Sequence, residues 1–498
     1  MRRFLVFTIA LGVVLGFMAA PAQAQAPAPK VTINGLVDFV GTYYENWSGG
    51  GGLSLDPTDR ETGWYSRERG VFTITGEIGR AKGVLALEFD FTNGFNAGGS
   101  GGCSAGFPGT SAGADLDTDC AGFVETKWLY VEAPIMGPGS MMPFIPAATL
   151  LRAGMQPARG HDYKTGILFS GDFPGVTLES QWAPNVKSTL TYAQLRETLD
   201  ETLGPAATES WAALLSVEIG VFKGLTVKPT YAYMRADGGT GNASLGVPPV
   251  AGFNPNGTNL YTERHTIGGD VRWTTGPFSL QPTFYYQFGD QQVAAGGEDV
   301  DISAWIVDVT GGFRTGPLNI EGRVMWTPGN DAPDQIGGAG SADIKYYAPI
   351  NPAFAYLAGW SEIWTSGIDY ATAYLAAAPG MSYRTSPSYD KYGRIFVGTA
   401  VDYALTPALT LRGLLNSSWT SEEVDTDGTI GAAGIPAVNS GDATWLGWEL
   451  ALGMTYRFAP NVALDLIGAT LQDGDARDSN GNDAKDVWKA SARVRVTW

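Results

Sequence analysis

The sequence predicts an all-β fold, a transmembrane antiparallel β-barrel of about 18 strands with long extracellular loops. The prediction depends on a strict alternation of apolar and polar side chains, on a regular alternation of short and long links, and on composition. The 498 residues include 67 Gly, 15 Trp, 21 Tyr and 22 Phe, whereas only 16% are charged. This composition is typical of strands that carry aromatic girdles at two membrane interfaces and are joined by glycine-containing turns.

The amino-terminal segment has the pattern of a secretory signal peptide. Arginines precede the apolar run Phe4 to Met18, and Ala22-Gln23-Ala24 offers a small-x-small cleavage site. We therefore expect a signal peptide over residues 1–24 and a single barrel domain over residues 25–498. No later stretch of 18 apolar residues occurs, and the mean hydropathy is -0.04. A helical membrane protein is thereby excluded, whereas a barrel is not, because alternation along each strand lowers the hydropathy.

The carboxyl-terminal segment shows the alternation most clearly. One row, expected to face lipid, consists of Trp488, Ala490, Ala492, Val494, Val496 and Trp498; the other, expected to face water, consists of Lys489, Ser491, Arg493, Arg495 and Thr497. A terminal strand that closes on Phe or Trp resembles that of Gram-negative outer-membrane β-barrels. The resemblance implies that the barrel assembly machinery recognises this strand, which ends at Trp498. An exposed edge strand of a soluble sandwich is the alternative interpretation.

About 18 segments with this alternation can be placed along the chain. Their expected spans are 31–44, 69–79, 83–93, 123–133, 148–156, 174–182, 186–196, 210–222, 225–235, 264–274, 278–288, 301–314, 318–327, 391–404, 408–419, 444–458, 461–472 and 488–498. Tight links such as Lys223-Gly224 and Thr315-Gly316-Pro317 alternate with longer ones. One link on the tight side, Pro134 to Ala147, is long. Because short turns lie on the periplasmic side of outer-membrane barrels, we expect both termini in the periplasm.

The segment Val31-Thr32-Ile33-Asn34-Gly35-Leu36-Val37-Asp38 resembles the first strand of general porins, in which a Gly and an Asp interrupt an apolar alternation. The size and strand number are also similar to those of 18-stranded sugar-specific, amino-acid-specific and alginate-exporting channels. The resemblance implies an outer-membrane porin that lets small hydrophilic solutes and ions diffuse passively through a water-filled, loop-constricted pore. It further implies contacts with outer-membrane lipid and lipopolysaccharide, and it leaves a homotrimer open. The alternative functions are a dedicated polysaccharide exporter and, after it, a barrel enzyme or scaffold.

Function is expected on the inward face, opposite the aromatic and aliphatic row. The charged side chains expected to line the pore are Asp38, Glu77, Glu88, Asp90, Arg152, Arg272, Arg323, Arg394, Asp402, Arg412, Glu449, Arg457, Arg493 and Arg495. So many charges cannot be buried in a dry core without close pairing, and we therefore expect a hydrated lumen. The alternative is a small barrel filled by an ion-pair network, although about 18 strands enclose more space than side chains fill.

The loop from Pro157 to Pro174 is a candidate constriction. It resembles in position the third loop of general porins, which folds into the barrel. Its expected constriction residues are Arg159, His161, Asp162, Lys164 and Asp172. The resemblance implies that Asp162 and Asp172 face wall arginines such as Arg394, Arg412 and Arg457. An ordinary polar surface loop is the alternative.

The link from Pro328 to Asp390 has an aromatic centre with few charges, from Tyr346 to Tyr374. Apolar patches of this kind usually mark contact surfaces. We expect the segment to pack inside the barrel, against a neighbouring subunit, or on its own aromatic residues.

Cys103 and Cys120 are the only two cysteines, and both fall in one glycine-rich link. Two cysteines in an exported chain most often pair, so we expect a disulfide between them. Two acid-rich stretches, Asp115 to Asp119 and Asp473 to Asp483, resemble weak Ca²⁺ sites. Neither has the spacing and the closing Glu of an EF-hand loop, so no metal site is predicted.

The sequence offers little for catalysis or for binding nucleic acid. The two histidines, His161 and His265, lie near expected loop ends, and no nucleophile-elbow, Walker, zinc-ligand or haem-attachment motif occurs. We therefore expect no enzyme activity and no cofactor. His265 beside Glu263 is the one catalytic candidate, and an ordinary histidine at the barrel rim is the alternative. The formal net charge of -18 argues against nucleic acid as a partner.

Overall fold

The computed structural model describes residues 28–46, 62–93, 124–164, 166–197, 209–237, 259–293, 300–331, 343–350, 356–364, 367–368, 392–426, 441–478 and 483–498. The expected signal peptide, Cys103, Cys120 and the stretch Asp115 to Asp119 lie outside these residues. Among the described residues, no helix is long and apolar enough to cross a membrane.

Eighteen strands form one closed antiparallel sheet. They are β1 (Lys30–Glu45), β2 (Thr62–Ile78), β3 (Ala81–Asn93), β4 (Glu125–Met136), β5 (Ala148–Pro157), β6 (Asp172–Ala183), β7 (Val186–Glu197), β8 (Glu209–Phe222), β9 (Leu225–Asp237), β10 (Asn259–Thr275), β11 (Phe278–Val293), β12 (Val300–Thr315), β13 (Leu318–Thr327), β14 (Arg394–Ala404), β15 (Leu409–Val424), β16 (Ala443–Ala459), β17 (Val462–Asp473) and β18 (Val487–Thr497). A short 3₁₀ helix, η4 (Asp475–Arg477), precedes β18.

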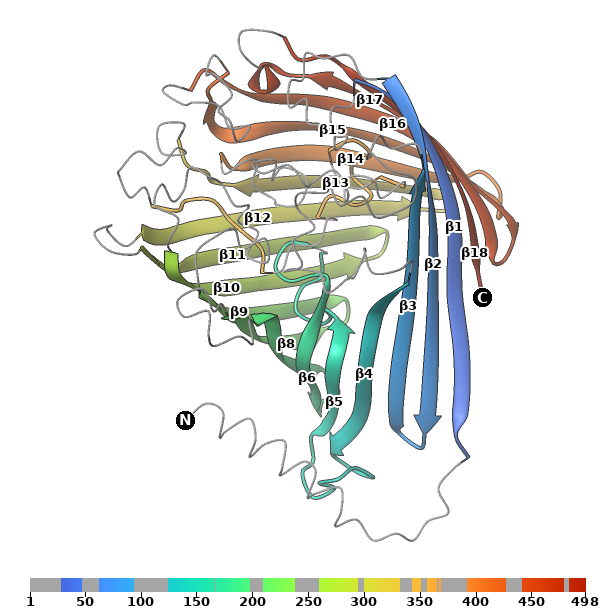
Figure 1. The fold of residues 1–498 in the computed structure, drawn as a ribbon, viewed down its shortest axis with the longest axis vertical. Coiled ribbons are helices and arrows are strands. Elements are labelled where there is room, and N and C mark those ends of the chain that lie inside the picture. The colour runs from blue at the N-terminus through green and yellow to red at the C-terminus, as the bar shows by residue number, and fades with distance from the viewer. Residues whose placement is uncertain are drawn as a thin grey trace.

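Each strand pairs with the next one along the chain, and β1 also pairs with β18, so the sheet closes into a barrel. Figure 1 shows this order as a colour sequence that runs around the barrel and ends with β18 beside β1. The predicted fold class and strand number are confirmed. The largest boundary difference is in β2, which begins at Thr62 instead of residue 69.

The register of the sheet sorts side chains into an inner and an outer row. Asp38 lies opposite both Arg495 of β18 and Arg69 of β2. Directly opposed residues share a face, so these three charged side chains belong to the inner row. The intervening residues Val37 and Phe39 are exposed on the outer face. The same alternation in β18 exposes Trp488, Val494, Val496 and Trp498 on the outside.

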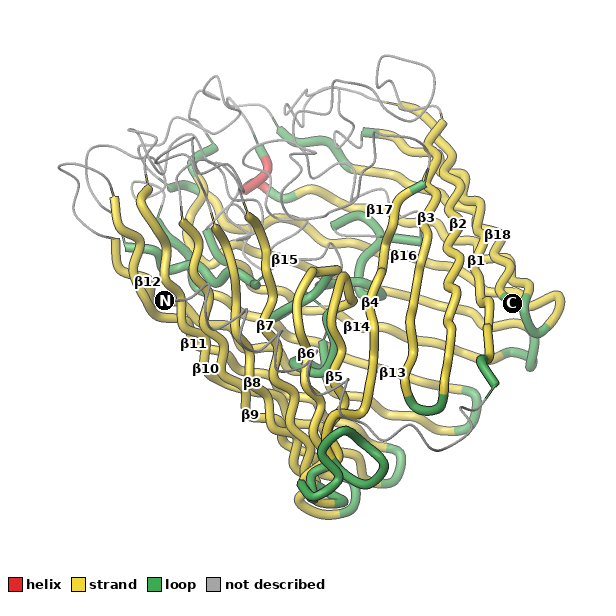
Figure 2. Tube along the Cα trace, turned by 60° about the horizontal axis from the view of Figure 1, so that its bottom comes forward, coloured by secondary structure: helices red, strands yellow, loops and turns green. Residues whose placement is uncertain are grey.

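Short and long links alternate, so the two ends of the barrel differ. Short links such as Lys223-Gly224 join strands at one end, which we call the turn end; the long links gather at the other, the loop end (Figure 2). β1 starts and β18 finishes at the turn end, because Lys30 lies opposite Glu77 beside the β2–β3 turn and Thr497 lies opposite Leu36. The exception on the turn side is the predicted one: residues 137–147 form a long link between β4 and β5.

Barrel closure depends on a contact between Gly35 and Trp498. The backbone of each residue donates a hydrogen bond to the carbonyl oxygen of the other, both at 3.1 Å. A Cβ atom on Gly35 would lie 2.2 Å from the Trp498 ring, which also meets Phe72 edge-on at 5.4 Å between centroids. Only glycine admits the terminal ring here, because no side-chain carbon approaches another so closely. The glycine of the first-strand motif is therefore explained by the space that the Trp498 ring occupies.

The buried apolar side chains lie inside the barrel, where two links pack on the wall. One cluster joins Ile167, Leu168 and Phe169 to inner-row residues of β7 to β14. Tyr347, Ile350, Tyr356 and Leu357 belong to the same cluster. Both the β5–β6 loop (described over 158–164 and 166–171) and the β13–β14 loop (described over 343–350, 356–364 and 367–368) therefore fold inward. For the aromatic link, packing inside the barrel is the observed outcome among the three expected.

Candidate functional site

The structure places the predicted wall charges on the inner row of the barrel. By the register, this row includes Asp38, Glu77, Glu88, Arg152, Arg272, Arg323, Arg394, Asp402, Arg412, Glu449, Arg493 and Arg495. Arg457 belongs to the same row, opposite Ala463, and is exposed at the turn end of β16. Asp90 lies opposite Arg69 in the backbone register, and its side chain lies outside the described residues.

Seven consecutive strands, β3 to β9, each contribute one charge to an inner-row series in which the signs alternate. The members of this charge series are Lys82, Glu132, Arg152, Glu179, Lys187, Glu218 and Lys228. The N–O distances between ion-paired neighbours are 2.7, 2.9, 3.4, 2.9 and 3.3 Å, and Lys187 lies opposite Glu218 in the register. Several members stay partly exposed: the side chains of Lys82, Lys187 and Glu218 are 42%, 41% and 40% exposed. The series therefore lines a wet part of the interior.

Several other inner charges also pair across neighbouring strands. Arg323 and Asp308 form an ion pair at 2.6 Å. Asp465 accepts from both Arg493, at 3.0 Å, and Arg495, at 2.8 Å. Arg412 and Asp402 lie 3.9 Å apart and are about one-third exposed. Glu88 pairs with Arg69 and Lys127.

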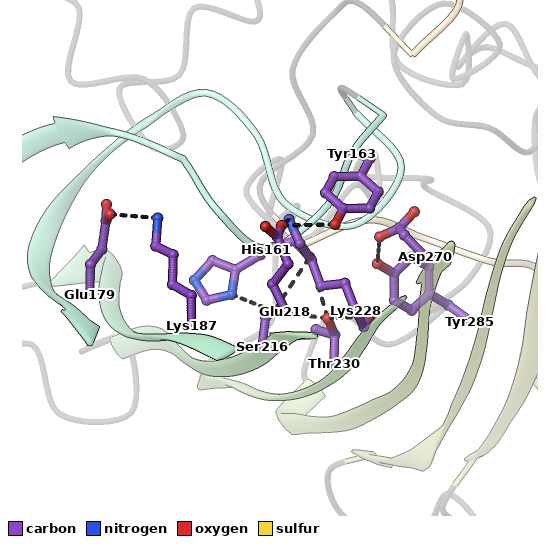
Figure 3. Close-up of polar contacts among 10 residues, drawn as sticks. All are labelled: His161, Tyr163, Glu179, Lys187, Ser216, Glu218, Lys228, Thr230, Asp270 and Tyr285. Atoms are coloured by element: carbon purple, nitrogen blue, oxygen red, sulfur yellow. Dashed lines mark hydrogen bonds and ion pairs between the residues drawn. The ribbon is translucent and has the colours of Figure 1, made fainter. Parts of the chain in front are cut away.

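His161 anchors the β5–β6 loop to the barrel wall. Its Nδ1 lies 2.9 Å from the Ser216 hydroxyl (Figure 3). Its Nε2 lies 2.8 Å from the Thr191 hydroxyl, so both ring nitrogens contact the inner row. The imidazole is buried, and burial, together with the charge of Lys228, lowers its pKa from 6.5 to about 3. His161 is therefore neutral near pH 7.

Asp162 follows His161 and is partly buried. One carboxylate oxygen accepts the backbone N–H groups of Leu168 and Phe169 at 3.2 and 3.3 Å. Burial and, to a smaller extent, the nearby Asp270 carboxylate raise the pKa of Asp162 from 3.8 to about 7. The loop is thus closed by a carboxyl group that titrates near neutral pH.

Tyr163 and Lys164 connect the loop to the wall charges. The Tyr163 hydroxyl donates to Glu218 at 2.8 Å (Figure 3). Lys228 Nζ and the Arg272 guanidinium carbon lie over the Tyr163 ring, 3.8 and 4.0 Å from its centroid. Burial and the bond to Glu218 raise the pKa of the Tyr163 phenol. Lys164 Nζ donates to Asp308 Oδ1 at 2.5 Å.

The other two predicted loop residues lie apart from this cluster. Asp172 starts β6, pairs with Lys127 at 3.3 Å and accepts the Trp128 indole N–H at 2.7 Å. Arg159 is exposed.

The β13–β14 loop crosses from one part of the wall to another. Near β10 to β12, Ile344 exchanges backbone hydrogen bonds with Asp301 and Ser303, at 2.7 and 2.9 Å. The Ala348 carbonyl accepts from Gln287 at 2.7 Å and from Arg264 at 3.2 Å. The loop also joins the β5–β6 loop, because Ile350 N donates to Leu168 O at 2.8 Å.

The far half of the β13–β14 loop is bound by charged residues of β14 to β18. The buried Glu449 carboxylate accepts the Ser361 hydroxyl and the Glu362 backbone N–H, both at 2.6 Å. Basic side chains donate to loop carbonyls or hydroxyls: Arg394 to Tyr356, Arg412 to Gly359, Lys489 to Glu362 and Arg493 to Ile368. This loop therefore spans the interior between strands that are distant in the closed sheet.

These contacts differ from the predicted pairing of loop acids with wall arginines. Arg394 and Arg412 hold the β13–β14 loop, whereas Asp162 binds backbone amides of its own loop and Asp172 pairs with Lys127. The analogy with general porins set acids of one loop against arginines of the wall, but here the second inward loop binds two of those arginines, Arg394 and Arg412. The seat of this second loop depends on contacts between residues far apart in the chain, and a local sequence pattern does not predict such contacts.

Sequence reasoning also missed Lys82 and Glu132 as members of the charge series and Arg264, Gln287 and Asn416 as loop anchors. The series had a signal, because each member lies towards the turn end of its strand and the sign alternates from one strand to the next. The loop anchors had no signal in the sequence. Gln287 and Asn416 can be identified as anchors only from the structure, where they donate to the carbonyl oxygens of Ala348 and Trp360.

His265, the one catalytic candidate of the sequence, belongs to the outer row. Its ring stacks on Phe288 at 4.9 Å, and its Nδ1 lies 2.7 Å from the Tyr231 hydroxyl. In the acid-rich segment before β18, Arg477 pairs with Asp473, and Asp478 accepts the Ala484 N–H at 2.7 Å. In the described part of the chain, no group of three or more His, Cys, Asp or Glu side chains is placed to hold a metal ion.

Comparisons with known proteins complete the description of the chain. No protein-family model and no curated protein matches the sequence. Solved structures that match it include Pseudomonas aeruginosa OccK5 (OpdH), with 11% identity, a TM-score of 0.48 and coverage of 93% of this chain and 97% of that chain. OpdQ from the same organism has 11% identity, a TM-score of 0.48 and coverage of 94% and 98%. OpdL, also from P. aeruginosa, has 13% identity, a TM-score of 0.46 and coverage of 94% and 98%.

Proposed function

We propose that the chain is an outer-membrane porin that lets small hydrophilic solutes and ions diffuse through a water-filled pore narrowed by the β5–β6 and β13–β14 loops. The carrying observation is the charge series on the inner row of a closed barrel whose outer row is apolar. A lipid-facing exterior and a hydrated interior are the two properties of a transmembrane barrel. Half-exposed, paired charges are compatible with a wet lumen and not with a dry core.

The two inward loops support a constricted pore over a wide one. They are held by hydrogen bonds and ion pairs from both halves of the wall, and they bury apolar side chains against it. The proposed pore-lining charges are the predicted inner-row residues, and the proposed constriction residues are His161, Asp162 and Lys164, with Asp172 and Arg159 at the edges of the loop.

The proposal also includes how the chain is exported and assembled. Residues 1–24 act as the signal peptide, and the strand that ends at Trp498 is presented to the barrel assembly machinery. Lipid and lipopolysaccharide then cover the outer row.

Neither alternative function gains an observation in its favour. Export of an anionic polysaccharide calls for a continuous basic wall, whereas the charges alternate in sign along β3 to β9. A barrel enzyme needs an accessible acid–base group, but His265 lies among outward aromatic rings and His161 is fixed between two hydroxyls.

Planar-bilayer recording tests the proposal. The purified barrel should give discrete conductance steps, and replacing residues 343–368 by a short Gly-Ser linker should raise the step size, because the narrowest section dominates the resistance of a pore. A variant with Leu215→Ile, on the exposed outer row of β8 and outside both loops, serves as the matched control for step size. A folded barrel without conductance steps would contradict the channel, and an unchanged step in the linker variant would contradict the constriction.

A further inference from the structure

The link between β4 and β5 is a built structure at the turn end of the barrel. Met142 N donates to Ile135 O at 2.9 Å, Ser140 N to Gly137 O at 3.1 Å and Ile145 N to Met142 O at 3.3 Å. Gly137 and Gly139 take left-handed backbone conformations, with φ of 91° and 73°, that let the chain turn back on itself. Residues 137–147 are therefore a compact knob, where the other turn-end links need only a few residues (Figure 2).

The knob is apolar, and its tip is exposed. No charged residue occurs between Glu132 and Arg152. Phe144 is 79% exposed, more than any other large apolar side chain of the described chain, and Met141 is 37% exposed. Water disfavours such a tip, so a covering partner is expected.

The base of the knob is continuous with the outer row. Thr149 and Ser180 are out of phase with the inner-row pair Arg152 and Glu179, which puts them on the outer face. Yet they are only 2% and 6% exposed and bond each other at 2.8 Å. The Thr149 hydroxyl also donates to the carbonyl of Ala147, the last residue of the knob, at 3.5 Å, so the knob ends beside the outer face of β5.

A cation of the neighbouring β2–β3 turn contacts the knob. Arg80, in the β2–β3 turn, donates from Nη1 to the Pro138 carbonyl at 2.6 Å and remains exposed. An apolar tip beside an exposed cation matches the boundary between acyl chains and phosphate headgroups.

We propose that the β4–β5 knob is an interfacial anchor, in which Phe144 and Met141 insert into the periplasmic leaflet and Arg80 meets lipid phosphates. This inference rests on the proposed membrane location and adds a lipid-binding element to it. Lipid is the occupant because the knob continues the apolar outer face, which lipid already covers in the proposed location.

The experiment places an environment-sensitive NBD label at single cysteines of the full chain, in a Cys103→Ser, Cys120→Ser background. The test site is Phe144→Cys; the controls are Leu215→Cys, on the outer row in the middle of β8, and Asn185→Cys, in the exposed β6–β7 turn. Each variant is reconstituted into phosphatidylethanolamine–phosphatidylglycerol vesicles that contain lipids with a quencher at a shallow or a deep acyl position.

The anchor predicts a blue-shifted label at residue 144 that the shallow quencher suppresses more than the deep one. Arg80→Gln should weaken that quenching in vesicles rich in phosphatidylglycerol. A label at 144 that behaves like the one at 185, while the label at 215 is quenched, would overturn the anchor and leave the barrel in the membrane. Loss of quenching at 215 as well would overturn the membrane location itself. A blue shift at 144 without lipid quenching, with energy transfer between labelled copies, would assign the knob to a second chain and also overturn the proposal.

Discussion

Replacing Asp162 by asparagine should make the β5–β6 loop detach from the wall as the pH falls. The neighbouring groups His161 and Asp162 have pKa values displaced in opposite directions, to about 3 and about 7. The His161 pKa is lowered by burial, so its contribution to anchoring is complete above its ordinary pKa of 6.5 and is lost as the pH falls towards 3. The Asp162 pKa is raised by burial, so its contribution is complete below 3.8 and is lost as the pH rises through about 7.

The two contributions nearly cancel in the intact loop. Between about pH 7 and about pH 4.5, protonation of a released His161 favours detachment by roughly 2–3 kcal/mol, and protonation of the bound Asp162 opposes it by a similar amount. The wild-type barrel should therefore show little change over this range. With Asp162→Asn, which keeps an oxygen for Leu168 and Phe169, the histidine acts alone and the detached population should rise roughly 100-fold.

The assay is single-channel recording in symmetric salt at the two pH values, with the fraction of time in high-conductance states as the readout. His161→Gln should show the reverse trend, with more open time at the higher pH. Arg159→Gln, an exposed change in the same loop, is the matched control. Equal open fractions for Asp162→Asn and wild type at the lower pH would refute the reasoning, because the histidine would then not be buried when the loop is bound.

Three further predictions concern closure, loop anchoring and selectivity. Gly35→Val should lower the stability of the barrel by about 1–3 kcal/mol, because the new side chain overlaps the Trp498 ring. The measurement is the temperature at which the folded barrel no longer runs apart from the unfolded chain on a gel. Gly41→Val is the control on the same strand and should be tolerated, because a Cβ atom there meets nothing within 4 Å. Glu449→Ala should release the β13–β14 loop and raise single-channel conductance, whereas Glu449→Gln, which keeps one acceptor, should have a smaller effect; equal conductance in all three chains would contradict the anchoring role. Lys187→Gln should shift the reversal potential in a salt gradient towards cation preference, since selectivity follows the sign of the lining charge; a shift towards anions would exclude Lys187 from the conducting path.

The sequence predicts the wall of the barrel well because the information is local. Alternation with a period of two decides which face each residue takes, and glycine-rich short turns limit each strand. The start of β2 was predicted seven residues too late, because Arg67 and Glu68 are adjacent charges in a stretch that otherwise has the composition of a loop. Arg67 is nevertheless an inner-row residue opposite Val40, buried inside the barrel.

The packing inside the barrel is harder to predict, because there some inner-row side chains are as apolar as those of the outer row. Ala212 and Leu214 of β8 and Ala232 and Met234 of β9 face inward at the loop end, yet they are apolar and fully buried. A wet lumen would favour polar residues at these positions, so their presence marks a wall that the inward loops keep dry. The same strands carry Glu218 and Lys228 nearer the turn end, where the charge series stays partly exposed. An inner row that changes from charged to apolar along one strand therefore indicates where a loop seats, and the amino-acid sequence alone carries this signal. Substituting Met234 by lysine tests this role of the apolar wall: the charge should displace the β5–β6 loop and raise conductance, and an unchanged conductance would show that the loop position does not depend on the apolar wall.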